Sequence, residues 1–235
     1  ICFKNGVLDI ENMKFHHHND DNVKNLIFLN QVGIEYYPSV SEDSTTLKFF
    51  NDMTGGNEED IKYLYQVLGV MISNYRSFKN IFYFTGPKDT GKSRFLKLAE
   101  LILTNPDGTK DFSNIGLKVL ADENSKEFTG IIGKRANISG ETPDVSIYND
   151  VLLKSLSGGD TIHAQVKFKD PIEFVNKAML IFAGNTVPSF FTRDKSSIAE
   201  RLLVYEFKKK IPKDKQIKEI EKKLDLRYVV FKAIE

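Results

Sequence analysis

The chain carries, at residues 81–93, the sequence Ile81-Phe82-Tyr83-Phe84-Thr85-Gly86-Pro87-Lys88-Asp89-Thr90-Gly91-Lys92-Ser93. Its first four residues are apolar and rich in β-branched and aromatic side chains, which predicts a buried strand. Its last eight match the pattern G-x-x-x-x-G-K-[ST] in full. A helical pattern continues from Gly91 to about Thr104. A strand, a glycine loop and a helix in succession predict an α/β fold with a parallel sheet flanked by helices.

The glycine loop has the residue types that phosphate binding requires. Glycines let the backbone wrap closely, so that successive N–H groups point at phosphate oxygens, and the helix that follows adds a partial positive charge. Lys92 is expected to reach the β- and γ-phosphates, and the Ser93 hydroxyl is expected to bind Mg²⁺. The predicted cofactors are therefore ATP and Mg²⁺, and the predicted ATP-binding residues are Gly86, Pro87, Lys88, Asp89, Thr90, Gly91, Lys92 and Ser93.

Composition limits the class of protein. With 235 residues, 41% hydrophobic and 28% charged, the sequence is typical of a globular chain with one large domain, or one domain and a small appendage. The net charge is +1, from 33 basic and 32 acidic residues, so any nucleic-acid surface must be local. The single cysteine, Cys2, cannot form an internal disulfide and fits a reducing compartment. No apolar run is long enough to span a membrane, and no signal peptide is visible. We therefore expect a cytoplasmic protein.

The order of elements suggests three parts: an accessory region at 1–75, a motor domain at 76–210 and a basic, helical tail at 211–235. The chain begins at Ile1 without a methionine, so we expect a longer polypeptide with further domains. Three adjacent histidines at 16–18 are interpreted as a solvated turn. Further expected strands lie at 7–10, 136–139, 178–183 and 202–207, and expected helices at 46–53, 58–75, 147–156 and 216–224.

Three further residues are candidates for the catalytic site. Glu141 follows the strand at 136–139 and would lie near the metal and the attacking water, whereas Gly140 stands where many such sites carry a second carboxylate. Asn185 follows the strand at 178–183 and would orient the attacking water. Arg201 precedes the last strand and would offset charge on a γ-phosphate. Each alone also fits a plain role: a surface glutamate, a turn asparagine and a surface salt-bridge arginine.

Residues 162–175 alternate in polarity and turn at Asp170-Pro171, which predicts a β-hairpin. Lys167, Phe168 and Lys169 lie near its tip. Two cations beside an aromatic ring suit single-stranded DNA, because the ammonium groups meet phosphates and the ring stacks on a base. The alternative is an edge hairpin whose lysines prevent aggregation.

Taken in order, these motifs resemble the superfamily 3 helicases of the phage and plasmid primase-helicase type, a branch of the AAA+ ATPases. Gly86 to Ser93 resembles the family's Walker A motif, and Ile138 to Thr142 is similar to its Walker B motif. The likeness continues in four more segments: Asn5 to Ile10 before the motor, Leu153 to Ile162 after Walker B, Ala183 to Pro188 at sensor 1, and Glu200 to Leu202 at the arginine finger.

The resemblance implies an ATP-dependent DNA helicase of a phage-, plasmid- or island-type replication protein in a bacterial host. Lys92, Glu141, Asn185 and Arg201 would be catalytic, with Ser93 and Glu141 near Mg²⁺. Arg201 would act on ATP bound by a neighbouring subunit, which implies a ring, typically a hexamer. The hairpin at Lys167–Lys169 would project into the pore and hold single-stranded DNA. A primase or origin-binding domain would lie outside these residues, and no membrane partner is expected.

Two other classes of function remain open at this point. A P-loop kinase would share the glycine loop, but the hairpin and the Asn185 segment argue against it, and no substrate lid is evident. A nucleotide-regulated initiator would bind DNA without robust unwinding. The presence of both Glu141 and Arg201 favours hydrolysis over a passive switch.

Overall fold

The computed structural model describes residues 1–235 except 29, 74–78, 123–124, 143–145, 166–169 and 192–194, and of Glu141 it describes the backbone. The fold is built on a five-stranded sheet in the order β12-β4-β10-β6-β5, in which every neighbouring pair is parallel. These strands span Leu202–Glu206, Ile81–Thr85, Met179–Gly184, Ala136–Thr142 and Phe112–Ser113. The predicted α/β architecture is confirmed.

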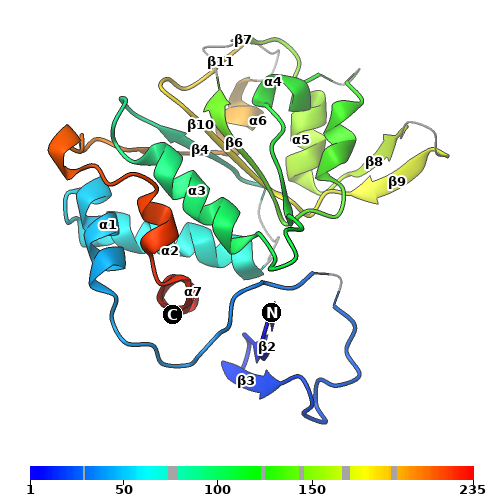
Figure 1. Cartoon of the computed structure of the whole chain (residues 1–235). Coiled ribbons are helices and arrows are strands. Elements are labelled where there is room, and N and C mark those ends of the chain that lie inside the picture. The colour runs from blue at the N-terminus through cyan, green and yellow to red at the C-terminus, as the bar shows by residue number, and fades with distance from the viewer. Residues whose placement is uncertain (29, 74–78, 123–124, 143–145, 166–169, 192–194) are drawn as a thin grey trace.

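Alternate residues of the central strands enter two separate hydrophobic cores, as the period of two in a strand requires. In β4, Phe82 and Phe84 belong to one core, while Ile81 and Tyr83 belong to the other. The first core is covered by α1 (Ser44–Thr54), α2 (Glu58–Ser73), α3 (Lys92–Ile102) and α7 (Leu226–Ile234). The second is covered by α4 (Leu117–Leu120), η1 (Glu127–Ile131), α5 (Val151–Gly158) and α6 (Lys195–Ala199). Figure 1 shows the sheet between these two layers.

The N-terminal residues form a small antiparallel sheet of β1 (Cys2–Phe3), β2 (Gly6–Asp9) and β3 (Lys14–His17). The interpretation of the three histidines as a solvated turn is wrong for two of them, because His16 and His17 lie in β3 and the His16 side chain is buried. The sheet packs through Phe3 and Leu8 into the same core as α1 and α2.

Two short pairs of strands flank the main sheet. β8 (Thr161–Ala164) and β9 (Ile172–Val175) pair antiparallel, which confirms the arms of the expected hairpin. Lys167, Phe168 and Lys169 lie outside the described residues. β7 (Ser146–Ile147) and β11 (Ser189–Phe190) form a parallel pair, which lies at the top of the view in Figure 1. Because residues 146–147 are a strand, α5 begins at Val151, four residues later than expected.

The C-terminal segment differs from its predicted helix at 216–224. It contains two short 3₁₀ helices, η2 (Lys213–Lys215) and η3 (Ile220–Lys223), and Glu219 between them has a left-handed φ of 52°, which interrupts any longer helix. The true helix, α7, begins after Asp225, whose side chain accepts a hydrogen bond from the Arg227 N–H and so caps it.

Residues from the first 75 and the last 25 positions enter the same core as the sheet. The division of the chain into an accessory region, a motor domain and a tail, at residues 75 and 210, remains a prediction. None of the helices in the described part of the chain is both long enough and apolar enough to span a bilayer.

Helix α7 approaches α2 most closely at Gly69, where an added Cβ would lie 2.1 Å from the Ala233 carbonyl oxygen. Alanine in a helix interior normally stabilises relative to glycine by about 1 kcal/mol. Here we expect the opposite sign: Gly69→Ala should lower the free energy of unfolding by about 1–3 kcal/mol, because the two helices must separate. Urea unfolding measures this change.

The matched control is Gly116→Ala, since an added Cβ at Gly116 has open space around it. Gly116 is the N-cap residue of α4, where alanine is a poorer cap than glycine, but alanine also restricts the unfolded chain. Because these two effects oppose each other, the free energy of unfolding should change by less than about 0.5 kcal/mol. Equal stability of both variants would contradict the packing of α7 on α2.

Candidate nucleotide-binding site

The glycine loop between β4 and α3 has the backbone geometry of a phosphate cradle. Gly86 and Gly91 have left-handed φ values of 131° and 93°, and Asp89 has a φ of 66°. A Cβ at Gly86 would lie 2.2 Å from the Phe207 carbonyl oxygen, so the residue after β12 occupies the space that a side chain would need. Both glycines are therefore required by the local conformation.

The first turn of α3 presents uncapped N–H groups to the loop. Gly91 is the N-cap residue and supplies no side-chain hydrogen bond, so no side chain caps the start of the helix and competes with an anion there. The Lys92 Nζ donates to the Gly86 carbonyl at 2.5 Å and to the Pro87 carbonyl at 2.7 Å. Burial lowers the pKa of the Lys92 ammonium below its usual value. A phosphate group would supply the negative charge that this partly buried ammonium and the helix terminus both favour.

Asn185 lies beside the loop because two strands hold its segment. Thr85, the last residue of β4, donates its hydroxyl to the Asn185 carbonyl at 3.1 Å, and the Tyr83 hydroxyl donates to the Thr186 carbonyl at 2.8 Å. A Cβ at Gly184 would lie 2.3 Å from the Tyr83 hydroxyl oxygen, which explains the glycine before Asn185. The Asn185 side chain is exposed, and the residue lines the pocket next to the glycine loop.

Strand β6 brings the Glu141 backbone to the same edge of the sheet, since Thr142 pairs with Gly184 of β10. A Cβ at Gly140 would lie 3.3 Å from Leu96 Cδ1 of α3, so a larger side chain there would press on this apolar contact. Thr142 ends the segment that is similar to a Walker B motif, but no sequence pattern marks it as a site residue. It lines the pocket, and its buried hydroxyl has no hydrogen-bond partner among the described residues.

Arg201 lies at the opposite edge of the sheet. Its carbonyl accepts a hydrogen bond from the Ile81 N–H at 2.7 Å, at the start of β4, whereas the glycine loop follows the end of β4. The five residues of β4 span about 17 Å. The Arg201 guanidinium donates instead to the Lys154 carbonyl at 2.7 Å and to the Ser157 hydroxyl at 2.9 Å. The structure thus brings Lys92, Ser93 and Asn185 together and separates Arg201 from them.

The pocket at the glycine loop has a volume of about 1080 Å³ and extends well beyond the loop. Its further walls come from α1 and from the segment after β12, which sequence motifs did not assign to the site. The lining residues from these two regions are Phe49, Asp52, Met53, Ile211, Lys213, Lys215, Gln216, Ile217, Lys218 and Ile220. In the sequence, the C-terminal residues are marked only by their lysines, which predict a basic tail, and no motif marks the three residues of α1.

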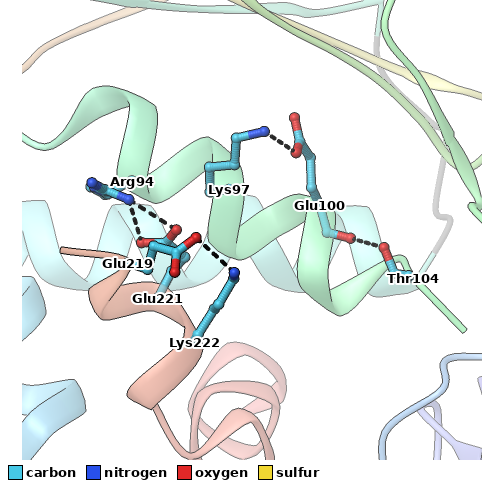
Figure 2. A network of polar contacts seen from close by, with 7 residues as sticks. All are labelled: Arg94, Lys97, Glu100, Thr104, Glu219, Glu221 and Lys222. Atoms are coloured by element: carbon cyan, nitrogen blue, oxygen red, sulfur yellow. Dashed lines mark hydrogen bonds and ion pairs between the residues drawn. The ribbon is translucent and has the colours of Figure 1, made fainter. Parts of the chain in front are cut away.

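An ion pair fixes this C-terminal segment to the helix that follows the glycine loop. Arg94 in the first turn of α3 donates to both carboxylate oxygens of Glu221, at 3.1 and 3.2 Å, and Glu221 is buried. Figure 2 shows the pair beside the Glu219–Lys222 and Lys97–Glu100 contacts. A buried carboxylate without its cation would be costly, so this contact holds η3 against α3.

Comparison with known proteins places this site in a family. Residues 84–201, from the end of β4 to Arg201, match the family of unknown function DUF5906. The chain belongs to this family. The match includes the glycine loop and the segments that carry Glu141 and Asn185.

This chain is also similar to two known proteins. The chain is 26% identical over 198 residues to the candidate helicase L207/L206 of Acanthamoeba polyphaga mimivirus, which covers 83% of this chain and 20% of the mimivirus protein. Two apo structures of the C-terminal region of NrS-1 superpose with TM-scores of 0.61 and 0.59, at 15% identity over 85% of this chain. The chain spans about a fifth of the mimivirus protein and about half of the NrS-1 region. The predicted resemblance to helicases is confirmed by the first relative, and the second confirms the fold.

Thr142 provides a test of the pocket's geometry. A buried hydroxyl without a partner costs about 1–3 kcal/mol. We therefore expect Thr142→Val, which keeps the shape, to raise the free energy of unfolding by about 1 kcal/mol. Thr142→Ser, which keeps the hydroxyl, is the control and should not stabilise. A loss of stability in Thr142→Val would show that the hydroxyl has a partner. Chemical unfolding of both variants measures the difference.

Proposed function

We propose that the chain is an ATP-hydrolysing motor of the helicase type that acts on DNA. The proposal rests on one observation. The Lys92 loop, the Asn185 segment and the end of β6 lie at the same edge of the sheet and line one pocket. The mimivirus relative named as a candidate helicase supports the same class of activity.

The mechanism follows from where charge develops on the phosphates. The N–H groups of the loop and of the first turn of α3, together with Lys92, bind and orient the phosphates. Asn185 faces the same pocket and orients the attacking water, and Glu141 at the end of β6 accepts its proton. Bound Mg²⁺ would neutralise phosphate charge, with the Ser93 hydroxyl and Glu141 as the residues to hold it.

Arg201 completes the site of a neighbouring subunit in this proposal. It lies about one strand length from its own glycine loop, so it is poorly placed to serve its own nucleotide. A head-to-tail contact between copies would bring the Arg201 edge of one subunit to the loop edge of the next, and a closed series of such contacts is a ring. We propose a homo-hexamer that translocates on single-stranded DNA, with a primase or origin-binding domain outside these residues.

Sharing of the site between subunits is tested by mixing two inactive variants. Lys92→Ala removes the proposed contact with the phosphates, and Arg201→Ala removes the guanidinium that is proposed to act on the neighbouring subunit's ATP. Each variant alone should hydrolyse ATP at least about a hundredfold more slowly than the wild type. Arg201→Ala should still bind ATP. In a 1:1 mixture, about a quarter of the interfaces pair an intact loop with an intact finger, and activity should return in proportion.

The control for this experiment is Ser157→Ala, which removes a hydrogen-bond partner of Arg201 but leaves the guanidinium. It should retain most of the activity. Absence of any recovery in the mixture would contradict a role for Arg201 in trans, and full activity of Lys92→Ala alone would contradict ATP hydrolysis at the glycine loop.

The hairpin of β8 and β9 is proposed to contact DNA through Lys167, Phe168 and Lys169. Changing both lysines to alanine should weaken binding of single-stranded DNA and unwinding, while basal ATP hydrolysis is unaffected, since the hairpin precedes the start of β10 whereas Asn185 follows its end. Fluorescence anisotropy with a labelled oligonucleotide, at several salt concentrations, measures the affinity. Unchanged affinity would exclude this hairpin as the DNA contact.

A further inference from the structure

The nucleotide pocket has apolar walls that a triphosphate cannot use. Phosphates belong at the glycine loop and the first turn of α3. Apolar walls of the pocket come from Phe49 and Met53 of α1 and from Ile211, Ile217 and Ile220 of the C-terminal segment. Met53 and Ile211 lie closest to the loop, because an added Cβ at Gly91 would lie 2.5 Å from Met53 Cγ and 3.5 Å from Ile211 Cδ1. Phe49 and Met53 are buried, whereas Ile217 is 38% exposed and so has surface left to cover.

The C-terminal segment is fastened at two points, one on the glycine loop and one on α3. The Ile211 N–H donates to the Asp89 carbonyl within the loop at 2.8 Å, and the Gln216 side chain donates back to the Ile211 carbonyl at 2.9 Å. At its other end, the Arg94–Glu221 ion pair joins it to α3 (Figure 2). A wall held at both ends to the phosphate site keeps a fixed distance from it, as a binding surface must.

The charges of this segment also suit a nucleotide. Lys213, Lys215 and Lys218 line the same pocket, and none of them forms an ion pair with a carboxylate within the described part of the chain. An apolar surface with cations around it matches a flat base joined to an anionic sugar-phosphate.

We propose that residues 211–221 form the base-binding wall of the nucleotide pocket, with Ile217 packing on the base of a nucleoside triphosphate and α1 forming the opposite side. The inference rests on the proposed ATP site and assigns it the residues that bind the nucleoside. Burial of the exposed part of Ile217 against the base would contribute affinity for the nucleoside but none for the phosphates.

The test compares ATP with inorganic tripolyphosphate, which has no base, by calorimetry in the presence of Mg²⁺. Ile217→Ser should raise the Kd for ATP about fivefold, the loss expected when one aliphatic side chain no longer covers the base. Its Kd for tripolyphosphate should change by less than about twofold. Lys92→Ala should weaken both ligands.

The matched control is Ile10→Ser, because Ile10 is 41% exposed and lies outside the pocket. It should leave both dissociation constants unchanged. An unchanged ATP affinity in Ile217→Ser, or an equal loss for both ligands, would overturn the base-binding wall while the proposed ATP site stands. A wild-type chain that binds neither ligand would instead overturn the proposed function.

Discussion

The parallel pairing of β12, β4, β10, β6 and β5 is the constraint on which the rest of the molecule depends. Parallel strands all end at the same edge of a sheet, so residues that follow different strands meet there although they are far apart in sequence. The glycine loop after β4, Glu141 near the end of β6 and Asn185 after β10 are gathered by this rule alone. The same rule places Arg201, which precedes β12, at the other edge.

The pairing explains why the core elements could be predicted from the sequence. Strands buried on both faces are continuous apolar runs, as Ile81–Thr85 and Met179–Gly184 are, and each ends in glycine or a polar residue. The glycine loop was equally clear, since Gly86 and Gly91 occupy backbone conformations that other residues rarely adopt. For this reason the sequence motif alone predicts the position and the backbone conformation of the proposed phosphate loop.

Features set by long-range packing could not be predicted in the same way. Residues 216–224 contain many helix-forming residues, yet they form 3₁₀ turns because Glu219 is left-handed and Glu221 is drawn to Arg94. His16 is polar, but its strand pairs with β2 and buries it. The α1 and C-terminal walls of the pocket come from opposite ends of the chain, and no local pattern could bring Phe49 to Ile217.

In the proposed function, one chain holds only part of an ATP-hydrolysing site, and a neighbouring subunit supplies Arg201. The most direct measurement is the rate of ATP hydrolysis per chain over a hundredfold range of protein concentration, with the mass of the particles determined at each point. If the site is shared between subunits, the rate per chain rises as particles larger than the monomer form. A constant rate per chain in samples that remain monomeric would contradict it.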